Sequence, residues 1–168
     1  HPMSQGIALE GMRLVIDNLP RAFTAGDDLV ARANMMSAAM MGATAFQKGL
    51  GAIHAISHPI GAVYNTHHGT TNAVCMPAVL TLNAPKIRAR FDRAAPYLGI
   101  KGGFDGFCAF VQEFNDSFAI PRRLGDMGVD TGRIDALVDM ALADPSCSGN
   151  PVKLSKGSLR PVLEALIG

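Results

Sequence analysis

Apolar residues recur at helical spacing along almost the whole of this 168-residue chain, and few runs show the period-two alternation that is typical of a strand. A chain of this length is sufficient for one hydrophobic core, and it contains no internal repeat or low-complexity linker. We therefore predict an all-α fold, a helical bundle, which forms a single domain over residues 1–168.

The spacing predicts a succession of helices with loops near residues 20–26, 99–104, 121–130 and 144–155. The segment 27–49 is apolar or small on nearly all sides, so we expect it to be central and buried. Five phenylalanines between Phe104 and Phe118, three or four positions apart, predict a core stripe. Besides the histidine-rich segment described below, the predicted helices cover residues 4–23, 27–49, 70–85, 86–99, 103–119, 130–144 and 155–167.

Composition narrows the classes of function. Hydrophobic residues make up 48% of the chain and charged residues 17%, below the roughly 25% that is usual in globular domains. We infer that another polypeptide covers part of the apolar surface, and we expect self-association as a homo-oligomer. The net charge is +1 without a clustered basic face, which disfavours nucleic acid or an anionic membrane as a partner.

Cysteine use and hydropathy give further expectations. The three cysteines are far apart and form no CxxC pair, so neither a disulfide framework nor a zinc ribbon is indicated, and we expect small buried side chains in a cytoplasmic protein. No apolar run is long enough for a membrane span. The N-terminus lacks the pattern of a signal peptide.

Four of the five histidines lie between residues 51 and 77. His54 and His58 are four positions apart, which puts them on one face of a helix, so spacing alone pairs them as metal ligands. His68 follows His54 by fourteen positions, roughly 21 Å along a straight helix. A site shared by His54 and His68 therefore requires a bend within residues 59–67.

A single histidine on an apolar helix face is more often a hydrogen-bonded core residue than a ligand. Three within fifteen residues, in a chain with few other polar core candidates, favour metal binding or catalysis. Without a carboxylate, however, the set is incomplete for most metals. The sequence supplies break points for the bend at Pro59, Gly61, Asn65 and Gly69.

Residues 49–77 read GLGAIHAISHPIGAVYNTHHGTTNAVCMP. This stretch resembles the signature of the iron-containing (group III) alcohol dehydrogenases, GLGxxHxxxHxxGxxxxxxHGxxNxxxxP, and meets each of its fixed positions. The flanking segments are also similar. The resemblance covers essentially the whole chain, and it corresponds to the helical C-terminal domain of that family.

The resemblance implies a two-domain enzyme with an N-terminal α/β domain that binds NAD or NADP. A divalent metal, usually iron and sometimes zinc, is held by an Asp, a His four residues later, and two further His. His54 and His68 resemble those last two metal ligands. His58 resembles the histidine that lies near the nicotinamide and the substrate, which gives it a catalytic and a cofactor-binding role. This assignment replaces the pairing of His54 with His58 that spacing alone suggests.

Two parts of the family pattern do not occur in this chain. Positions 1–50 contain no Asp-x3-His pair, since their only histidine is His1, and no glycine-rich NAD(P) segment is found. We therefore expect the C-terminal half of a larger enzyme, which needs an N-terminal dinucleotide-binding domain as its partner and is inactive alone. His67 stands where many relatives have proline, and residues 45–48 differ from the usual Phe-Ser-Asn.

The activity that the resemblance implies is oxidation of small alcohols to aldehydes or ketones, with the metal as Lewis acid, the nicotinamide as hydride acceptor and His58 as proton relay. Two alternatives remain. The chain could be an inactive helical fragment or assembly module, or it could be similar to a maleylacetate reductase, although those enzymes usually lack this histidine pattern. For Phe46, the methionines and the cysteines we favour plain core packing over a role in a pocket.

Overall fold

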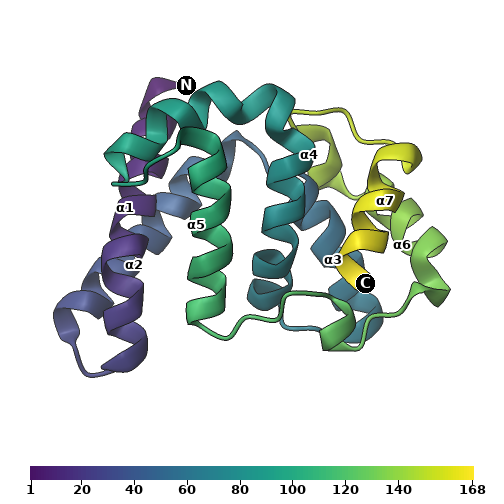
Figure 1. The fold of residues 1–168 in the computed structure, drawn as a ribbon, viewed down its shortest axis with the longest axis horizontal. Coiled ribbons are helices and arrows are strands. Elements are labelled where there is room, and N and C mark those ends of the chain that lie inside the picture. The colour runs from purple at the N-terminus through teal and green to yellow at the C-terminus, as the bar shows by residue number, and fades with distance from the viewer.

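The computed structural model describes residues 1–168 and contains helices but no strands (Figure 1). The predicted all-α class is confirmed. The α-helices are α1 Pro2–Thr24, α2 Leu29–Ala45, α3 Ala52–Tyr64, α4 His68–Tyr97, α5 Gly103–Ser117, α6 Ile134–Ala143 and α7 Lys156–Ile167. Short 3₁₀ helices are η1 Phe46–Lys48, η2 Gly125–Met127, η3 Thr131–Arg133 and η4 Pro145–Gly149.

Helix α4 corrects the prediction of two separate helices at 70–85 and 86–99, because it runs through Pro77, Pro85 and Pro96 without a break. A proline inside a helix has no N–H for the carbonyl four residues earlier. For Pro77 that carbonyl belongs to Ala73, and it accepts a hydrogen bond of 2.9 Å from the side-chain amide of Asn115 on α5. A neighbouring helix thus supplies the donor that the proline lacks.

The main core lies on one side of the molecule, where α3, the first half of α4, α6 and α7 meet (Figure 1). It contains 17 buried residues, among them Ile56, Cys75 and Leu163, whereas a second cluster of five lies between α4 and α5. Burial raises the pKa of the Cys75 thiol to about 12, so this cysteine behaves as the small buried side chain that we expected. Cys108 and Cys147 are only partly buried.

Helices α1 and α2 form a hairpin on the other side of the molecule (Figure 1). The prediction that residues 27–49 are central and buried is wrong, since only Ala31 and Ala38 of α2 are buried, and Met36 and Met40 are 71% and 72% exposed. The reason is that α1 covers one face of α2 and no other helix covers the rest. Helix α1 also continues through Pro20 to Thr24, so the predicted loop at 20–26 begins later than expected.

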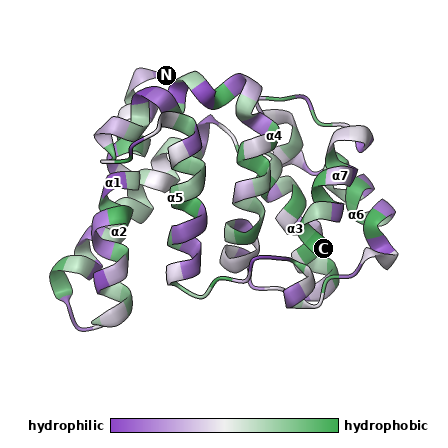
Figure 2. Ribbon diagram, viewed as in Figure 1, coloured by the Kyte–Doolittle hydropathy of each residue, from purple (hydrophilic) through white to green (hydrophobic).

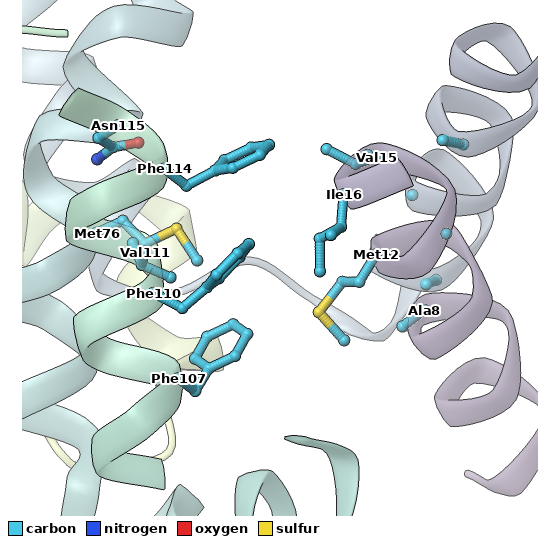
Figure 3. A pocket seen from close by; sticks show the side chains of 14 residues that line it. Ala8, Met12, Val15, Ile16, Met76, Phe107, Phe110, Val111, Phe114 and Asn115 are labelled. Atoms are coloured by element: carbon cyan, nitrogen blue, oxygen red, sulfur yellow. The ribbon is translucent and has the colours of Figure 1, made fainter. Parts of the chain in front are cut away.

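The phenylalanine stripe of α5 is only partly core. Phe104 and Phe107 are buried, as predicted, but Phe110, Phe114 and Phe118 are only partly buried. Figure 3 shows Phe107, Phe110 and Phe114 on one wall of an open apolar groove, with residues of α1 on the opposite wall. The groove has a volume of about 510 Å³. None of the helices is both long and apolar enough to cross a membrane.

Candidate functional site

The chain bends sharply between α3 and α4, and the predicted bend within residues 59–67 is confirmed. Helix α3 ends at Tyr64, Asn65 adopts a left-handed conformation with φ of 53°, and α4 begins at His68. An asparagine tolerates this conformation better than most residues. Of the candidate break points, only Asn65 lies at the bend: Pro59 and Gly61 lie inside α3, and Gly69 lies inside α4.

His67 has a local structural role at this bend. It is the N-cap of α4, and its Nδ1 accepts a hydrogen bond of 3.3 Å from the backbone N–H of Thr70. N-cap side chains satisfy one of the free N–H groups in the first turn of a helix. The residue that departs from the family pattern therefore fixes the start of the helix that carries His68.

The bend brings together the three histidines to which the sequence assigned functions. The ring centroids of His54 and His58 are 5.5 Å apart, those of His54 and His68 5.3 Å, and those of His58 and His68 5.6 Å. His54 and His58 project from one face of α3, and His68 lies in the first turn of α4. By distance alone, any two of the three rings could contact one common ligand.

Asn72 distinguishes the three rings from one another. Its side-chain nitrogen Nδ2 lies 3.0 Å from Nε2 of His68 and 3.4 Å from Nε2 of His54. Both Nε2 atoms therefore lie within hydrogen-bond distance of the same atom, and an amide N–H₂ group that donates to both rings requires a lone pair on each Nε2. The carbonyl oxygen Oδ1 of Asn72 is buried without a hydrogen-bond partner, as expected for a side chain whose polar surroundings are incomplete.

His58 makes a different contact. Its Nδ1 lies 2.9 Å from Oδ2 of Asp144, which comes from the loop after α6. Oδ1 of Asp144 accepts a hydrogen bond of 2.8 Å from the backbone N–H of Ser146 and so caps η4. The Asp144 side chain is 13% exposed. The carboxylate is thus fixed on both sides.

Sequence reasoning missed both Asp144 and the role of Asn72. Asn72 is a fixed position of the signature, so a signal for it was present. Asp144 follows helix α6 directly and precedes Pro145, a pattern that favours a capping turn, but nothing local places it beside a histidine 86 residues earlier.

The electrostatics of the cluster favour a neutral imidazole at His54. Burial lowers the pKa of His54, and the neighbouring rings of His68 and His58 lower it further. Burial alone would raise the pKa of Asp144, but hydrogen bonds from His58 and from the backbone of Ser146 outweigh burial and keep its pKa below the usual value. At neutral pH the site therefore combines a neutral His54 with an ionised Asp144.

A pair of asparagines ties the Asp144 loop to the start of α3. Asn150 and Asn83 exchange two hydrogen bonds of 2.7 and 2.9 Å through their side-chain amides. Oδ1 of Asn150 also accepts from the backbone N–H of Ala52, the first residue of α3, at 3.1 Å. Because α3 carries His54 and His58 and the loop carries Asp144, this network holds the two parts of the site in register.

The chain contains no group of three or more His, Cys, Asp or Glu side chains that could hold a metal ion together. Iron and zinc sites in enzymes usually have three or four protein ligands, a number that His54 and His68 do not reach by themselves. The donor type fits, since neutral imidazole nitrogen is a good ligand for both metals.

Comparison with known proteins identifies the family. The family described as Fe-containing alcohol dehydrogenase, C-terminal, matches residues 1–167 of the chain. The chain belongs to this family. The match extends from the exposed hairpin to α7, so both sides of the molecule are part of the family's domain.

Individual relatives agree with this assignment. A 4-hydroxybutyrate dehydrogenase from Cupriavidus necator is 39% identical over 98% of the chain, and an NAD-dependent methanol dehydrogenase from Bacillus methanolicus is 34% identical over 89%. The crystal structure of a 1,3-propanediol oxidoreductase superposes on 99% of the chain with a TM-score of 0.94 at 28% identity. The chain spans less than half of these proteins, namely 45%, 42% and 46% of their lengths.

Proposed function

We propose that this chain is the metal-binding helical domain of an iron-dependent, NAD(P)-linked alcohol dehydrogenase, and that residues 1–168 act as one domain of that enzyme. The observation that carries the proposal is that Nε2 of His54 and Nε2 of His68, fourteen positions apart in sequence, both face Nδ2 of Asn72 at the α3–α4 bend. Family membership supports it, because homologues that match nearly the whole chain are named as dehydrogenases of alcohols.

In this proposal His54 and His68 hold divalent iron, with zinc as the alternative metal, and His58 faces the nicotinamide and the substrate. The metal would supply Lewis acidity that lowers the pKa of the alcohol. His58 would accept the proton and pass it to solvent, a role that suits an imidazole near neutral pH. A separate N-terminal dinucleotide-binding domain would bring NAD or NADP and the remaining metal ligands.

The substrate class follows from the names of the relatives. One relative is named for methanol and another for 4-hydroxybutyrate, and both compounds are small molecules with a hydroxyl group. We propose a small alcohol, or the corresponding aldehyde in the reverse direction, for an enzyme of the cytoplasm. A maleylacetate reductase-like activity is less well supported, because the chain has the full histidine pattern that those enzymes usually lack.

Anaerobic titration of the chain with Fe²⁺ and with Zn²⁺ tests the metal site directly. We expect weak binding that is lost in His54→Ala and His68→Ala and retained in His58→Ala. Loss of binding in His58→Ala would overturn the assignment and favour the simple i,i+4 pairing of His54 with His58. The absence of binding to the wild-type chain would contradict a preformed half-site.

The competing proposal, that the chain is an inactive fragment or assembly module, is tested by NAD(P)-linked alcohol oxidation with and without an added N-terminal half. We expect activity only with both halves. Activity of the 168-residue chain alone would show that a separate cofactor domain is dispensable. No activity of the combined halves, with metal and NAD or NADP present, would favour the assembly module.

A further inference from the structure

The contact between His58 and Asp144 determines which nitrogen of His58 carries the proton. An ionised carboxylate can only accept hydrogen bonds, and Asp144 is held ionised at neutral pH by the contacts described above. At 2.9 Å from Oδ2, Nδ1 of a neutral His58 must therefore be the protonated nitrogen. Its Nε2 then has a free lone pair.

We propose that Asp144 is a positioning residue that holds neutral His58 in the tautomer protonated at Nδ1, so that Nε2 can accept a proton. The relevance of this tautomer for catalysis rests on the proposed function, in which His58 takes the proton of the alcohol. The tautomer itself does not depend on that function. With the proton on Nε2 instead, a neutral His58 could only donate from that atom.

The geometry of Asp144 makes its role directional. Oδ1 is committed to the backbone N–H of Ser146 at 2.8 Å, so only Oδ2 is available to His58. An asparagine at this position would keep its oxygen toward Ser146, because two N–H donors cannot face each other. Its NH₂ group would then face Nδ1 of His58 and donate to it, which requires the proton to move to Nε2.

This reversal makes Asp144→Asn a sharp test, because the variant keeps the size of the side chain and the cap of η4 while inverting the hydrogen bond to His58. The same substitution in a serine protease triad leaves the geometry intact and abolishes most activity through the wrong tautomer. Asp130→Asn is a matched control: Asp130 caps η3 through the backbone N–H of Gly132 at 2.7 Å, and its side chain is not bonded to any histidine.

The experiment is ¹⁵N NMR of the ring nitrogens of His58 in the 168-residue chain at pH 8, with His58→Gln used for assignment. We expect the Nδ1–H tautomer in the wild type and in Asp130→Asn, and the Nε2–H tautomer in Asp144→Asn. Asp144→Ser should retain the cap but not reach His58, and it should give a mixture of both tautomers. This second variant provides the test if Asp144→Asn does not fold.

Predominance of the Nε2–H tautomer in the wild type would overturn the proposal without any variant. An unchanged tautomer in Asp144→Asn would also overturn it. If Asp144→Asn does not fold, an unchanged tautomer in Asp144→Ser would have the same consequence. The proposed function is judged separately by titration of the same samples with Zn²⁺. Since Asp144 contacts neither Nε2 of His54 nor Nε2 of His68, we expect Asp144→Asn to retain Zn²⁺ binding, weakened only by the loss of a carboxylate charge that also acts on His54. A correct tautomer without metal binding would uphold the role of Asp144 and contradict the metal site alone.

Discussion

The two sides of the molecule use similar amounts of apolar sequence in opposite ways. Hydrophobic residues occur along the α1–α2 hairpin as well as along α3, α6 and α7 (Figure 2). On the α3–α6–α7 side they form the core of 17 buried residues, whereas most of the large apolar side chains of α2 are exposed. All three histidines of the site lie on α3 or in the first turn of α4, both of which contribute to this core. The site is therefore built on the well-packed part of the fold.

Glycines show the same contrast in packing. A Cβ on Gly149 would overlap the carbonyl oxygen of Leu50, whereas a Cβ on Gly42 of α2 would meet nothing within 4 Å. Close backbone approach next to the site means that the Asp144 loop and the start of α3 cannot shift independently. The hairpin has no comparable constraint, apart from Gly11, where a Cβ would lie 3.2 Å from Cβ of Met41.

The largest expected difference between the two sides is in the cost of removing an apolar side chain. Ile56 is fully buried beside the histidines on α3, so Ile56→Ala should lower the free energy of unfolding by about 3 kcal/mol. Met40→Ala, at an exposed position, should change it by less than about 0.5 kcal/mol. Urea denaturation followed by circular dichroism measures both. Equal losses would show that the hairpin is packed in solution.

Alanine in place of glycine should have opposite signs on the two sides. We expect Gly149→Ala to destabilise the fold by about 2 kcal/mol, because the added methyl group forces the backbone of Leu50 away. Gly42→Ala should stabilise it by about 0.5–1 kcal/mol, because α2 has room for the methyl group and alanine is the better helix former. Thermal unfolding of the two variants checks the signs, and a stable Gly149→Ala protein would contradict the tight contact.

Local patterns predicted the fold class and the placement of His54 and His58 on one face of a helix, but not the contacts between segments distant in sequence. The structure agrees with the i,i+4 spacing as a placement on α3 and with Asn65 as the turn residue. Continuation of α4 through Pro77 depends on Asn115, 38 positions further on. Asp144 and the exposure of α2 likewise depend on which helices become neighbours, which periodicity does not encode.

The apolar hairpin should be the surface through which the chain self-associates. Met36 and Met40 are the largest exposed apolar side chains near the middle of α2, and burial of a methionine contributes about 1.5–3 kcal/mol. Replacing both with lysine should weaken dimerisation by at least tenfold, as measured by sedimentation velocity over a range of concentrations. Met140→Lys, on the packed side at 41% exposure, is the matched control and should leave the association constant unchanged.

If the wild-type chain is monomeric at high concentration, the exposed apolar side chains of the hairpin do not cause self-association, and the prediction is wrong. Dissociation by Met140→Lys alone would place the interface on the packed side instead. Either result would show that the greater exposure of apolar side chains on the hairpin does not make the hairpin the surface for self-association.

The smallest effect concerns the charge state of the site. The folded-state pKa of His54 lies below its usual value of 6.5 because of burial and the neighbouring rings. Between these two values the unfolded chain binds more protons than the folded chain, so stability should fall as the pH is lowered through 6.5 toward the folded-state pKa, and level off below it. Since His54 is only partly buried, we expect this loss of stability to be less than about 1 kcal/mol.

The measurement is the difference in unfolding free energy between wild type and His54→Gln from pH 8 to pH 5, a window above the titration of Asp144. A wild-type chain that is relatively more stable at pH 5 would show that protonated His54 is favoured in the folded state. The surroundings of His54 on the packed side would then stabilise the protonated imidazole, whereas a metal ligand must be neutral.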